Sequence, residues 1–240
     1  MGKRVAILFY GLTRSLKDIY NNLKENLFNE LTKNNFEYDI FIHTYILDNS
    51  YKNPWSGESV KKYDNNAFKI LNPKDFILQK QSLIEARLNI PQYFKKIGNW
   101  KGCASTPKMY CYLLRNMVLA LHSKKKVVQL FAKYNKMNKY DYVIITRPDQ
   151  YLDTKINTDS FNLLANNNII IPFEHSYHGL NDRFCIAKPN VAIKYGLGLN
   201  KLKLYTIISP VVSEEYMKFY LTSIGVDIIY SPIKTHLVRC

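Results

Sequence analysis

Residues 3–45 read KRVAILFYGLTRSLKDIYNNLKENLFNELTKNNFEYDIFIHTY, and this stretch decides the fold class. Lys3 to Tyr10 is an almost continuous apolar run that ends at a glycine, which is typical of a strand buried on both faces. Apolar residues then recur at helical spacing from Leu16 to Leu31, with Ser15 in the position of a helix cap. Tyr38 to Tyr45 is a second apolar strand. Strand, helix and strand form the βαβ unit of a parallel sheet.

Patterns farther along the chain extend this unit into an α/β fold. Polar residues from Asn49 to Asn66 predict a long loop or lid, and Ala67 to Leu71 predicts a third strand. Thr106 and Pro107 predict the start of a helix, and the apolar pattern from Lys108 to about Asn135 supports either one long helix or two broken ones. The later elements that we expect are strands at Tyr140–Thr146, Ile169–Pro172, Phe184–Ala187 and Asp227–Tyr230, and helices at Pro189–Tyr195 and Ser213–Ile224. The whole predicts a Rossmann-like, mostly parallel central sheet flanked by helices.

The composition predicts one compact domain. Its 240 residues are 47% hydrophobic and 14% aromatic, which excludes a disordered or low-complexity protein. No run approaches the roughly 18 consecutive apolar residues of a membrane span, and the six from Val5 to Tyr10 are too few for a secretory signal. We therefore expect a cytoplasmic protein whose single domain has two halves, residues 1–150 and 151–240.

Several common site types lack their sequence signatures. The four cysteines, which are Cys103, Cys111, Cys185 and Cys240, form no C-x-x-C pair, so neither a zinc module nor a disulfide framework is indicated. The chain also lacks the G-x-G-x-x-G, P-loop and G-x-S-x-G motifs. A dinucleotide oxidoreductase, a P-loop NTPase and a hydrolase with a nucleophile elbow are therefore poorly supported.

The chain is strongly basic, with 34 Lys and Arg against 19 Asp and Glu and a formal net charge of +15. Such a charge suits nucleic acid, an anionic membrane surface or a phosphorylated ligand. Only seven of the 34 cations are arginine, the residue that base and phosphate recognition favours. We therefore expect no specific nucleic-acid partner, while a solvated basic surface and peripheral contact with an anionic membrane both stay open.

Polar residues that follow buried strands mark the expected ligand site, because open α/β sheets bind ligands at the carboxyl ends of their strands. Gly11 permits close approach of the backbone, and Arg14 can hold a phosphate or a base. Arg147 and Asp149 directly follow the strongest predicted strand. A carboxylate there can hold a divalent cation that bridges two phosphates. A structural ion pair between Arg147 and Asp149 is the alternative that stays open.

The order of these motifs resembles a family of small GT-A-type glycosyltransferases of bacteria and large DNA viruses, which use nucleotide-sugar donors. The segments that carry the resemblance are Val5–Arg14, Tyr38–Thr44, Tyr140–Asp149, Leu180–Phe184, Ser213–Glu215 and Ile224–Val226. They span nearly the whole chain, although each is short. The resemblance implies a GT-A-like fold with a nucleotide-sugar-binding half at 1–150 and an acceptor-binding half at 151–240.

The resemblance also implies roles for single residues. GT-A enzymes bind a metal and the donor diphosphate through an Asp-x-Asp motif, in which Arg147 here takes the first position and Asp149 the second. Asp182 would be the catalytic base, with an ordinary turn residue as the alternative. His236 would join Asp149 in holding Mn²⁺ or Mg²⁺. Because the first Asp of the motif is replaced by arginine, the dependence on a metal stays open.

The implied activity is transfer of a sugar from a nucleotide-diphosphate sugar to a glycan hydroxyl. Gly11, Arg14, Arg147 and Asp149 would bind the donor. The leaving nucleoside diphosphate develops negative charge that cations must stabilise, and the acceptor hydroxyl needs a carboxylate to take its proton. Some aromatic and histidine side chains suit sugar binding as well as ordinary packing, namely Trp55, Trp100, Tyr177 and the histidines of His175–Gly179.

Two other functions stay open at this point. The first is a non-catalytic basic module that binds polyphosphate, nucleic acid or anionic lipid, and its binding would fall steeply with salt. The second is a phosphotransferase that uses the same strand ends, although P-loop and kinase motifs are absent.

Overall fold

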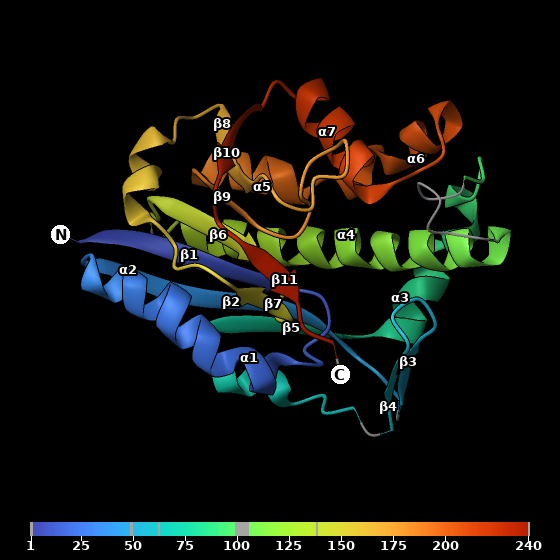
Figure 1. Cartoon of the computed structure of the whole chain (residues 1–240), viewed down its shortest axis with the longest axis horizontal. Coiled ribbons are helices and arrows are strands. Elements are labelled where there is room, and N and C mark those ends of the chain that lie inside the picture. The colour runs from blue at the N-terminus through green and yellow to red at the C-terminus, as the bar shows by residue number, and fades with distance from the viewer. Residues whose placement is uncertain (1, 49, 62, 99–105, 138, 240) are drawn as a thin grey trace.

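A computed structural model of the chain shows a mixed α/β fold built on one seven-stranded sheet (Figure 1). It describes residues 2–48, 50–61, 63–98, 106–137 and 139–239. The strands of this sheet are β1 (Lys3–Tyr10), β2 (Phe36–Ile46), β5 (Asp75–Lys80), β6 (Tyr142–Thr146), β8 (Asn168–Pro172), β9 (Cys185–Ala187) and β10 (Asp227–Ser231). Strands from both sides of residue 150 share this sheet.

The spatial order of the strands is β10-β8-β9-β6-β1-β2-β5. All neighbours pair in parallel except β9, which runs antiparallel to both β6 and β8. The first four strands have the spatial order third, second, first, fourth, as in doubly wound nucleotide-binding folds. Strands β2 and β5 are added on one side of β1, and β6 is added on its other side, so the strand order reverses between β1 and β6. Such a switch point leaves a crevice outside the carboxyl ends of those two strands.

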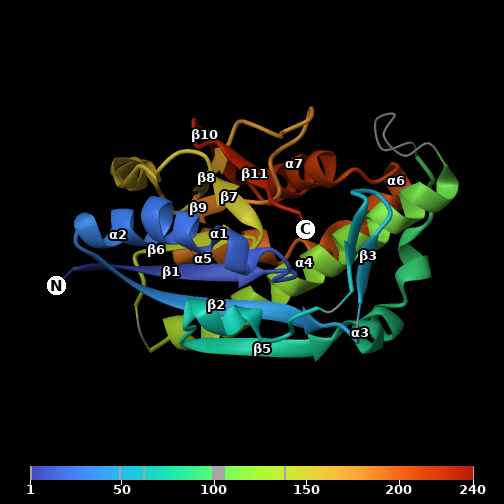
Figure 2. The same cartoon turned by 60° about the horizontal axis from the view of Figure 1, so that its bottom comes forward.

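Helices cover both faces of the sheet, and both views show them on either side of it (Figures 1 and 2). The helices are α1 (Leu16–Leu23), α2 (Asn29–Lys33), α3 (Gln81–Leu88), α4 (Pro107–Asn135), α5 (Pro189–Gly196), α6 (Leu199–Ile208) and α7 (Ser213–Ser223). Alternate residues of β1 enter opposite cores: Ala6 and Leu8 pack on the α4 side, and Ile7 and Phe9 on the α1 side. The predicted mostly parallel sheet flanked by helices is confirmed.

The long helix α4 begins as the sequence predicts. Thr106 is its N-cap, and the threonine Oγ1 accepts a hydrogen bond from the backbone N–H of Met109 at 3.1 Å. Pro107 occupies the first helical position, where its missing N–H is not needed. Lys124 to Lys126 lie within this helix, more than two turns before its end. None of the helices within the described residues is long and apolar enough to cross a membrane.

Ala67 to Leu71, which the sequence predicts as the third strand, is instead a short 3₁₀ helix. Its buried residues Ala67, Phe68 and Leu71 have the spacing of a helical turn and do not alternate. Asn72 then adopts a left-handed conformation with φ of 45°, which ends the turn. The third strand follows it as β5, which pairs in parallel with β2.

The first predicted helix is present but is not uniform. A π-helical segment at Lys24–Phe28 separates α1 from α2. The Ser15 hydroxyl donates to the carbonyl of Val238 at 2.8 Å, so it ties the helix start to the C-terminal segment and does not cap the helix. The expected loop at Asn49–Asn66 contains a hairpin of β3 (Tyr51–Asn53) and β4 (Glu58–Val60).

A second small sheet, which the sequence does not predict, positions the C-terminal segment. β11 (Thr235–Leu237) pairs antiparallel with β7 (Gln150–Leu152), and both views show the two strands together beside α1 (Figures 1 and 2). Beyond β11, the backbone N–H of Val238 donates to the carbonyl of Asp149 at 3.0 Å. The end of the chain is therefore held next to the turn that follows β6.

A candidate anion-binding pocket at the strand ends

A pocket of about 210 Å³ opens at the carboxyl ends of β1 and β6, at the switch point of the sheet. Its wall comes from the loop after β1, the β3–β4 hairpin, α3, α4, the turns that follow β6 and precede β9, the start of α7 and the C-terminal segment. Gly11 lies in this wall with φ of +101°, a conformation that favours glycine. Of the residues predicted for the site, the pocket brings together Gly11, Arg14, Arg147 and Asp182.

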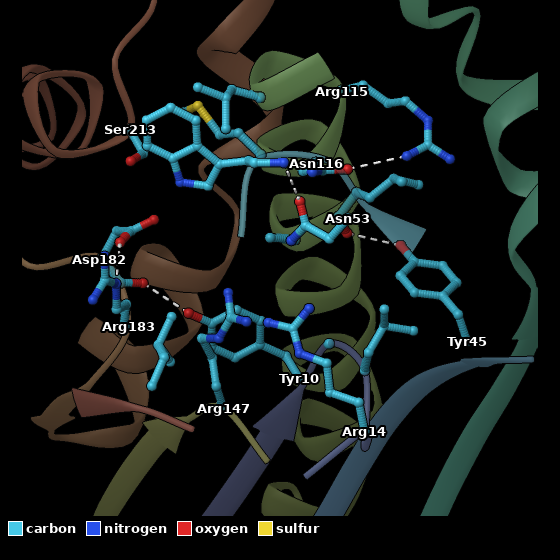
Figure 3. Close-up of a pocket in the computed structure, with 18 of the residues that line it drawn as sticks. Tyr10, Arg14, Tyr45, Asn53, Arg115, Asn116, Arg147, Asp182, Arg183 and Ser213 are labelled. Atoms are coloured by element: carbon cyan, nitrogen blue, oxygen red, sulfur yellow. Dashed lines mark hydrogen bonds and ion pairs between the residues drawn. The ribbon is translucent and has the colours of Figure 1, made fainter. Parts of the chain in front are cut away.

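Arginine is concentrated in this pocket. Five of the seven arginines in the sequence contribute to its wall, namely Arg14, Arg115, Arg147, Arg183 and Arg239. Figure 3 shows Arg14 and Arg147 together above the strand ends, with Arg183 on one side and Arg115 at the opposite end. Planar guanidinium groups match the oxygens of phosphate and carboxylate, so the pocket is suited to an anion.

Asp149 is fully buried beneath the pocket and holds two of these arginines. Its Oδ1 accepts from Nε of Arg147 at 2.8 Å, and its Oδ2 accepts from Nη2 of Arg147 at 2.7 Å. Oδ2 also accepts from Nε and Nη2 of Arg14 at 3.1 and 2.7 Å. Burial by itself would raise the pKa of Asp149, but the charges of Arg147 and Arg14 outweigh it and hold that pKa well below its usual range.

Arg14 is oriented from a second direction by the β3–β4 hairpin. Its Nε lies 3.2 Å from a carboxylate oxygen of Glu58, and its Nη1 donates to the Tyr51 hydroxyl at 2.6 Å. The guanidinium also lies over the Tyr51 ring, 5.4 Å from the centroid. The hairpin that the sequence analysis describes as a loop or lid thus fixes one wall of the pocket.

The turn that carries Asp182 is fixed through its backbone. The carbonyl of Asp182 accepts from the Tyr10 hydroxyl at 2.7 Å, from Nζ of Lys124 at 2.9 Å and from the Tyr195 hydroxyl at 3.1 Å. Figure 3 marks the contact with Tyr10. Lys124 is fully buried between the rings of Tyr10 and Tyr195, and burial lowers its pKa to about 8. The Asp182 side chain faces the pocket, 3.9 Å from Nε of Arg183.

A second carboxylate, Glu214, lies in the same wall at the start of α7. It is only 5% exposed, and its Oε2 accepts from the Ser213 hydroxyl at 2.8 Å. Burial, and then the charge of Asp182, raise its pKa to about 6. The pocket therefore holds two carboxylates, and the charge of Asp182 raises the cost of ionising Glu214.

Part of the pocket wall is uncharged. Trp55 from the β3–β4 turn and Asn116 from α4 line the pocket, and Arg115 in the same wall is ion-paired with Glu85. The remaining wall is supplied by apolar side chains of α4, which are Leu113, Met117, Leu119 and Ala120. An apolar surface edged by amide groups suits a flat heterocycle better than it suits a second anion.

His236 does not reach the pocket. Its Nδ1 lies 2.9 Å from the Asp153 carboxylate, and its ring stacks on Tyr151. The side chains of a strand alternate, so Leu237 and His236 point to opposite sides, and Leu237 faces the pocket. The structure therefore does not bring His236 together with Asp149 as the resemblance implies.

The described residues do not fit the metal that the resemblance implies. Both oxygens of Asp149 already accept hydrogen bonds from guanidinium groups, so this carboxylate presents no free face to a cation. No cluster of three or more His, Cys, Asp or Glu side chains that could hold a metal ion occurs among the residues that the structure describes. The ion pair left open for Arg147 and Asp149 is present, and it faces a pocket.

His43 in β2 is fully buried, and its two ring nitrogens hydrogen-bond to Ser123 and Gln79. Burial lowers its pKa to about 3, so it is a structural side chain. The aromatic and histidine side chains that the sequence singles out have mixed outcomes. Trp55 lies in the pocket wall. Tyr177 and the histidines of 175–179 are not among the side chains of that wall, and Trp100 lies outside the described residues.

Sequence reasoning missed Arg183, Arg239 and Lys124 as parts of the site. Arg183 directly follows Asp182 in the segment Leu180–Phe184, so the sequence could have indicated that Arg183 lies at the site. Arg239 reaches the pocket only because β11 pairs with β7, which no local pattern indicates. No known protein-family model matches the chain, and a search of curated proteins finds no significant match.

Proposed function

We propose that this protein is a GT-A-like glycosyltransferase that moves a sugar from a nucleotide-diphosphate sugar to a hydroxyl acceptor. The observation that carries the proposal is the gathering of five arginines around a pocket at the switch point of a doubly wound sheet, with Asp182 and Glu214 in the same wall. The arginines of the wall suit the diphosphate of a nucleotide sugar, and the apolar side chains of the wall suit the base.

In the proposed reaction the arginines bind the diphosphate of the donor. As the bond between the anomeric carbon and the β-phosphate oxygen breaks, its electron pair leaves with the nucleoside diphosphate. The guanidinium groups of Arg147 and its neighbours stabilise that charge. The acceptor oxygen forms the new glycosidic bond, and its proton passes to Asp182, whose side chain is part of the pocket wall and is held by a fixed turn.

Binding of nucleotides is the first test. We would record thermal unfolding of the full chain with UDP, GDP, CDP and ADP, each with EDTA and with Mn²⁺. A ligand present at 100 times its dissociation constant stabilises the folded state by about 2.7 kcal/mol, which shifts the transition visibly. We expect stabilisation that is selective for one base. If no nucleotide stabilises the protein under either condition, the proposal is wrong and a basic docking module becomes the better account.

Turnover is the second test, and it uses the sugar nucleotides of the selected base. Release of the free nucleoside diphosphate, with water or a sugar as acceptor, reports cleavage of the donor. Asp182→Asn should bind the donor with unchanged affinity and lower the rate by roughly 10²- to 10⁴-fold, as loss of a general base does. A variant that keeps the full rate would remove Asp182 from the role of base.

A further inference from the structure

We infer that this pocket binds the diphosphate with arginines alone, and that Arg183 and Arg239 occupy the role that a divalent cation has in GT-A enzymes. The inference deepens the proposed function, on which it rests for the nucleoside part of the ligand. For the diphosphate part it rests on the arrangement of donors in the pocket.

The carboxylate at the metal position is already used. Asp149 is fully buried, and four hydrogen bonds from Arg14 and Arg147 converge on its two oxygens. A divalent cation at these oxygens would have to displace one of the two guanidinium groups and would then face the positive charge of both. Asp149 therefore acts as a positioning residue that holds two arginines toward the pocket.

Several guanidinium donors remain available to a ligand. The hydrogen bonds of Arg147 use its Nε and Nη2, and within the described part of the chain its Nη1 has no protein acceptor. The nearest carboxylate oxygen to Arg183 lies 3.9 Å away, and no carboxylate among the described residues lies within ion-pair distance of Arg239. Each guanidinium carries five N–H donors, and pairs of them fit adjacent phosphate oxygens.

The position of Arg239 is set by the backbone of the residue before it, Val238. Val238 donates its N–H to the carbonyl of Asp149 and accepts from the hydroxyl of Ser15, so the residue before Arg239 is held at both polar groups. Burial, and the charges of Arg14 and other pocket arginines, lower the pKa of Arg239. These like charges face one another across the pocket, and a bound polyanion would relieve their repulsion.

The remaining carboxylates of the pocket are Asp182 and Glu214. One or two carboxylates together with substrate phosphates are enough to hold Mg²⁺ in some enzymes, so this pair defines the competing arrangement. Against it, the positive charge of Arg183 lies 3.9 Å from the Asp182 carboxylate and would repel a cation there, and the carboxylate of Glu214 accepts a hydrogen bond from Ser213. The two arrangements predict opposite effects of Mg²⁺ on the binding of a diphosphate.

Calorimetric titration with inorganic pyrophosphate distinguishes them. The full chain is titrated in EDTA and again in Mg²⁺. If arginines alone bind the diphosphate, pyrophosphate binds in EDTA, and Mg²⁺ leaves the affinity equal or weakens it because the cation neutralises part of the ligand charge. Arg183→Met and Arg239→Met should each weaken binding at least tenfold. Arg87→Met removes an exposed arginine outside the pocket and should have no effect.

Each outcome is informative. Binding that is tenfold or more tighter in Mg²⁺ and weakened by Asp182→Asn would overturn the inference and leave the glycosyltransferase proposal intact. Absence of pyrophosphate binding in both buffers also overturns it. Binding in EDTA that depends on Arg183 and Arg239, without binding of any nucleotide, upholds the arginine site and removes the proposed function. Melting temperatures of the two arginine variants should match that of Arg87→Met, which shows that lost binding is not lost folding.

Discussion

Asp149 is the residue on which the arrangement of the pocket depends most. It is a fully buried carboxylate whose charge is balanced by the guanidinium groups of Arg14 and Arg147. Removing one partner from such a group leaves uncompensated charge in a place of low polarity, which is far more costly than losing an exposed ion pair. Asp149, Arg14 and Arg147 thus form a buried network in which the carboxylate positions two guanidinium groups beside the pocket.

Asp149→Asn should therefore lower the free energy of unfolding by about 3 to 5 kcal/mol at pH 7, measured by urea denaturation. Because the folded-state pKa of Asp149 is lowered, its stabilising contribution is present above pH 4 and is lost as the pH falls further. The difference between wild type and variant should shrink below pH 4. Asp153→Asn, which removes an exposed carboxylate paired with His236, should change stability by less than about 0.5 kcal/mol. A loss below 1 kcal/mol for Asp149→Asn would contradict the role given to this network.

Folding favours the protonated form of Glu214, whereas it favours the ionised form of Asp149. Its folded-state pKa is raised from 4.5 to about 6, first by burial and then by Asp182, so the folded protein holds this proton more tightly than the unfolded chain does. The stabilisation is full below pH 4.5 and is lost as the pH rises through 6. A shift of one pKa unit corresponds to about 1.4 kcal/mol, so the whole effect amounts to about 2 kcal/mol.

Glu214→Gln cannot ionise and should escape this loss. Relative to wild type, the variant should gain about 2 kcal/mol of stability when urea denaturation at pH 8 is compared with that at pH 4. Asp182→Asn serves as the matched variant. It removes the carboxylate charge that, after burial, raises the pKa of Glu214, so the loss of stability should move to lower pH. Identical pH profiles for wild type and Glu214→Gln would show that Glu214 is not buried beside Asp182 as described.

At the scale of elements, the contact between the loop before β9 and the start of α7 sets the distance between the two carboxylates. The N–H of Leu180 donates to the carbonyl of Glu214 at 2.9 Å. A Cβ on Gly179 would come within 2.1 Å of the carbonyl carbon and oxygen of Glu214. Both atoms belong to the backbone, so the loop or the helix has to move to accept any side chain.

Gly179→Ala should lower the free energy of unfolding by about 1 to 3 kcal/mol or more, as overpacking does. It should also reduce turnover, because Asp182 is three residues away on the displaced loop. Gly198→Ala is the matched control. Gly198 directly precedes α6, its backbone angles (φ −50°, ψ −33°) suit any residue, and the nearest atom to its new Cβ is Cδ1 of Tyr220 at 3.5 Å. Restricting the unfolded chain there should stabilise the protein by about 0.4 to 1 kcal/mol. Equal stability of the two variants would show that Gly179 does not make this close contact.

The elements that the sequence predicts well are those with a strong period and clear ends. β1, β2 and α4 are long, and β6 is buried along its whole length. The cap at Thr106 and Pro107 is a chemical signal that needs no knowledge of the fold. The third strand was misplaced because the apolar run at Ala67–Leu71 is too short to separate a turn of helix from a strand. β7 and β11 have three residues each and are far apart in the sequence, so only tertiary structure pairs them.

The same division applies to the site. Gly11, Arg14, Arg147 and Asp149 could be predicted because they follow buried strands, and the topology of the sheet brings strand ends together. Arg239 could not be predicted as a site residue, because its position is a consequence of the β7–β11 pairing. The sequence also could not show that Leu237, and not His236, lines the pocket, because which of two adjacent residues faces it depends on the register of that pairing.

At the scale of the whole molecule, the positive charge is divided between two kinds of residue. The chain has 27 lysines and seven arginines, and five of the arginines are in the pocket wall. Lysines elsewhere set the net charge of +15 and therefore the long-range attraction to any polyanion. Recognition in the pocket and attraction to the surface are consequently separable properties of this protein, and they respond differently to salt and to substitution.

The basic docking module is the rival function, and salt distinguishes the two. Binding of a single-stranded RNA through surface lysines should fall by about 10³ to 10⁵ between 50 and 200 mM salt if six to ten phosphates are contacted. Pyrophosphate in the pocket releases few counterions, so its affinity should fall by less than about tenfold over the same range. Arg183→Met should weaken pyrophosphate binding and leave RNA binding within twofold, as measured by fluorescence anisotropy. RNA binding that persists at 200 mM salt and disappears in Arg183→Met would mean that the pocket itself holds nucleic acid, because only a built site combines resistance to salt with dependence on one arginine.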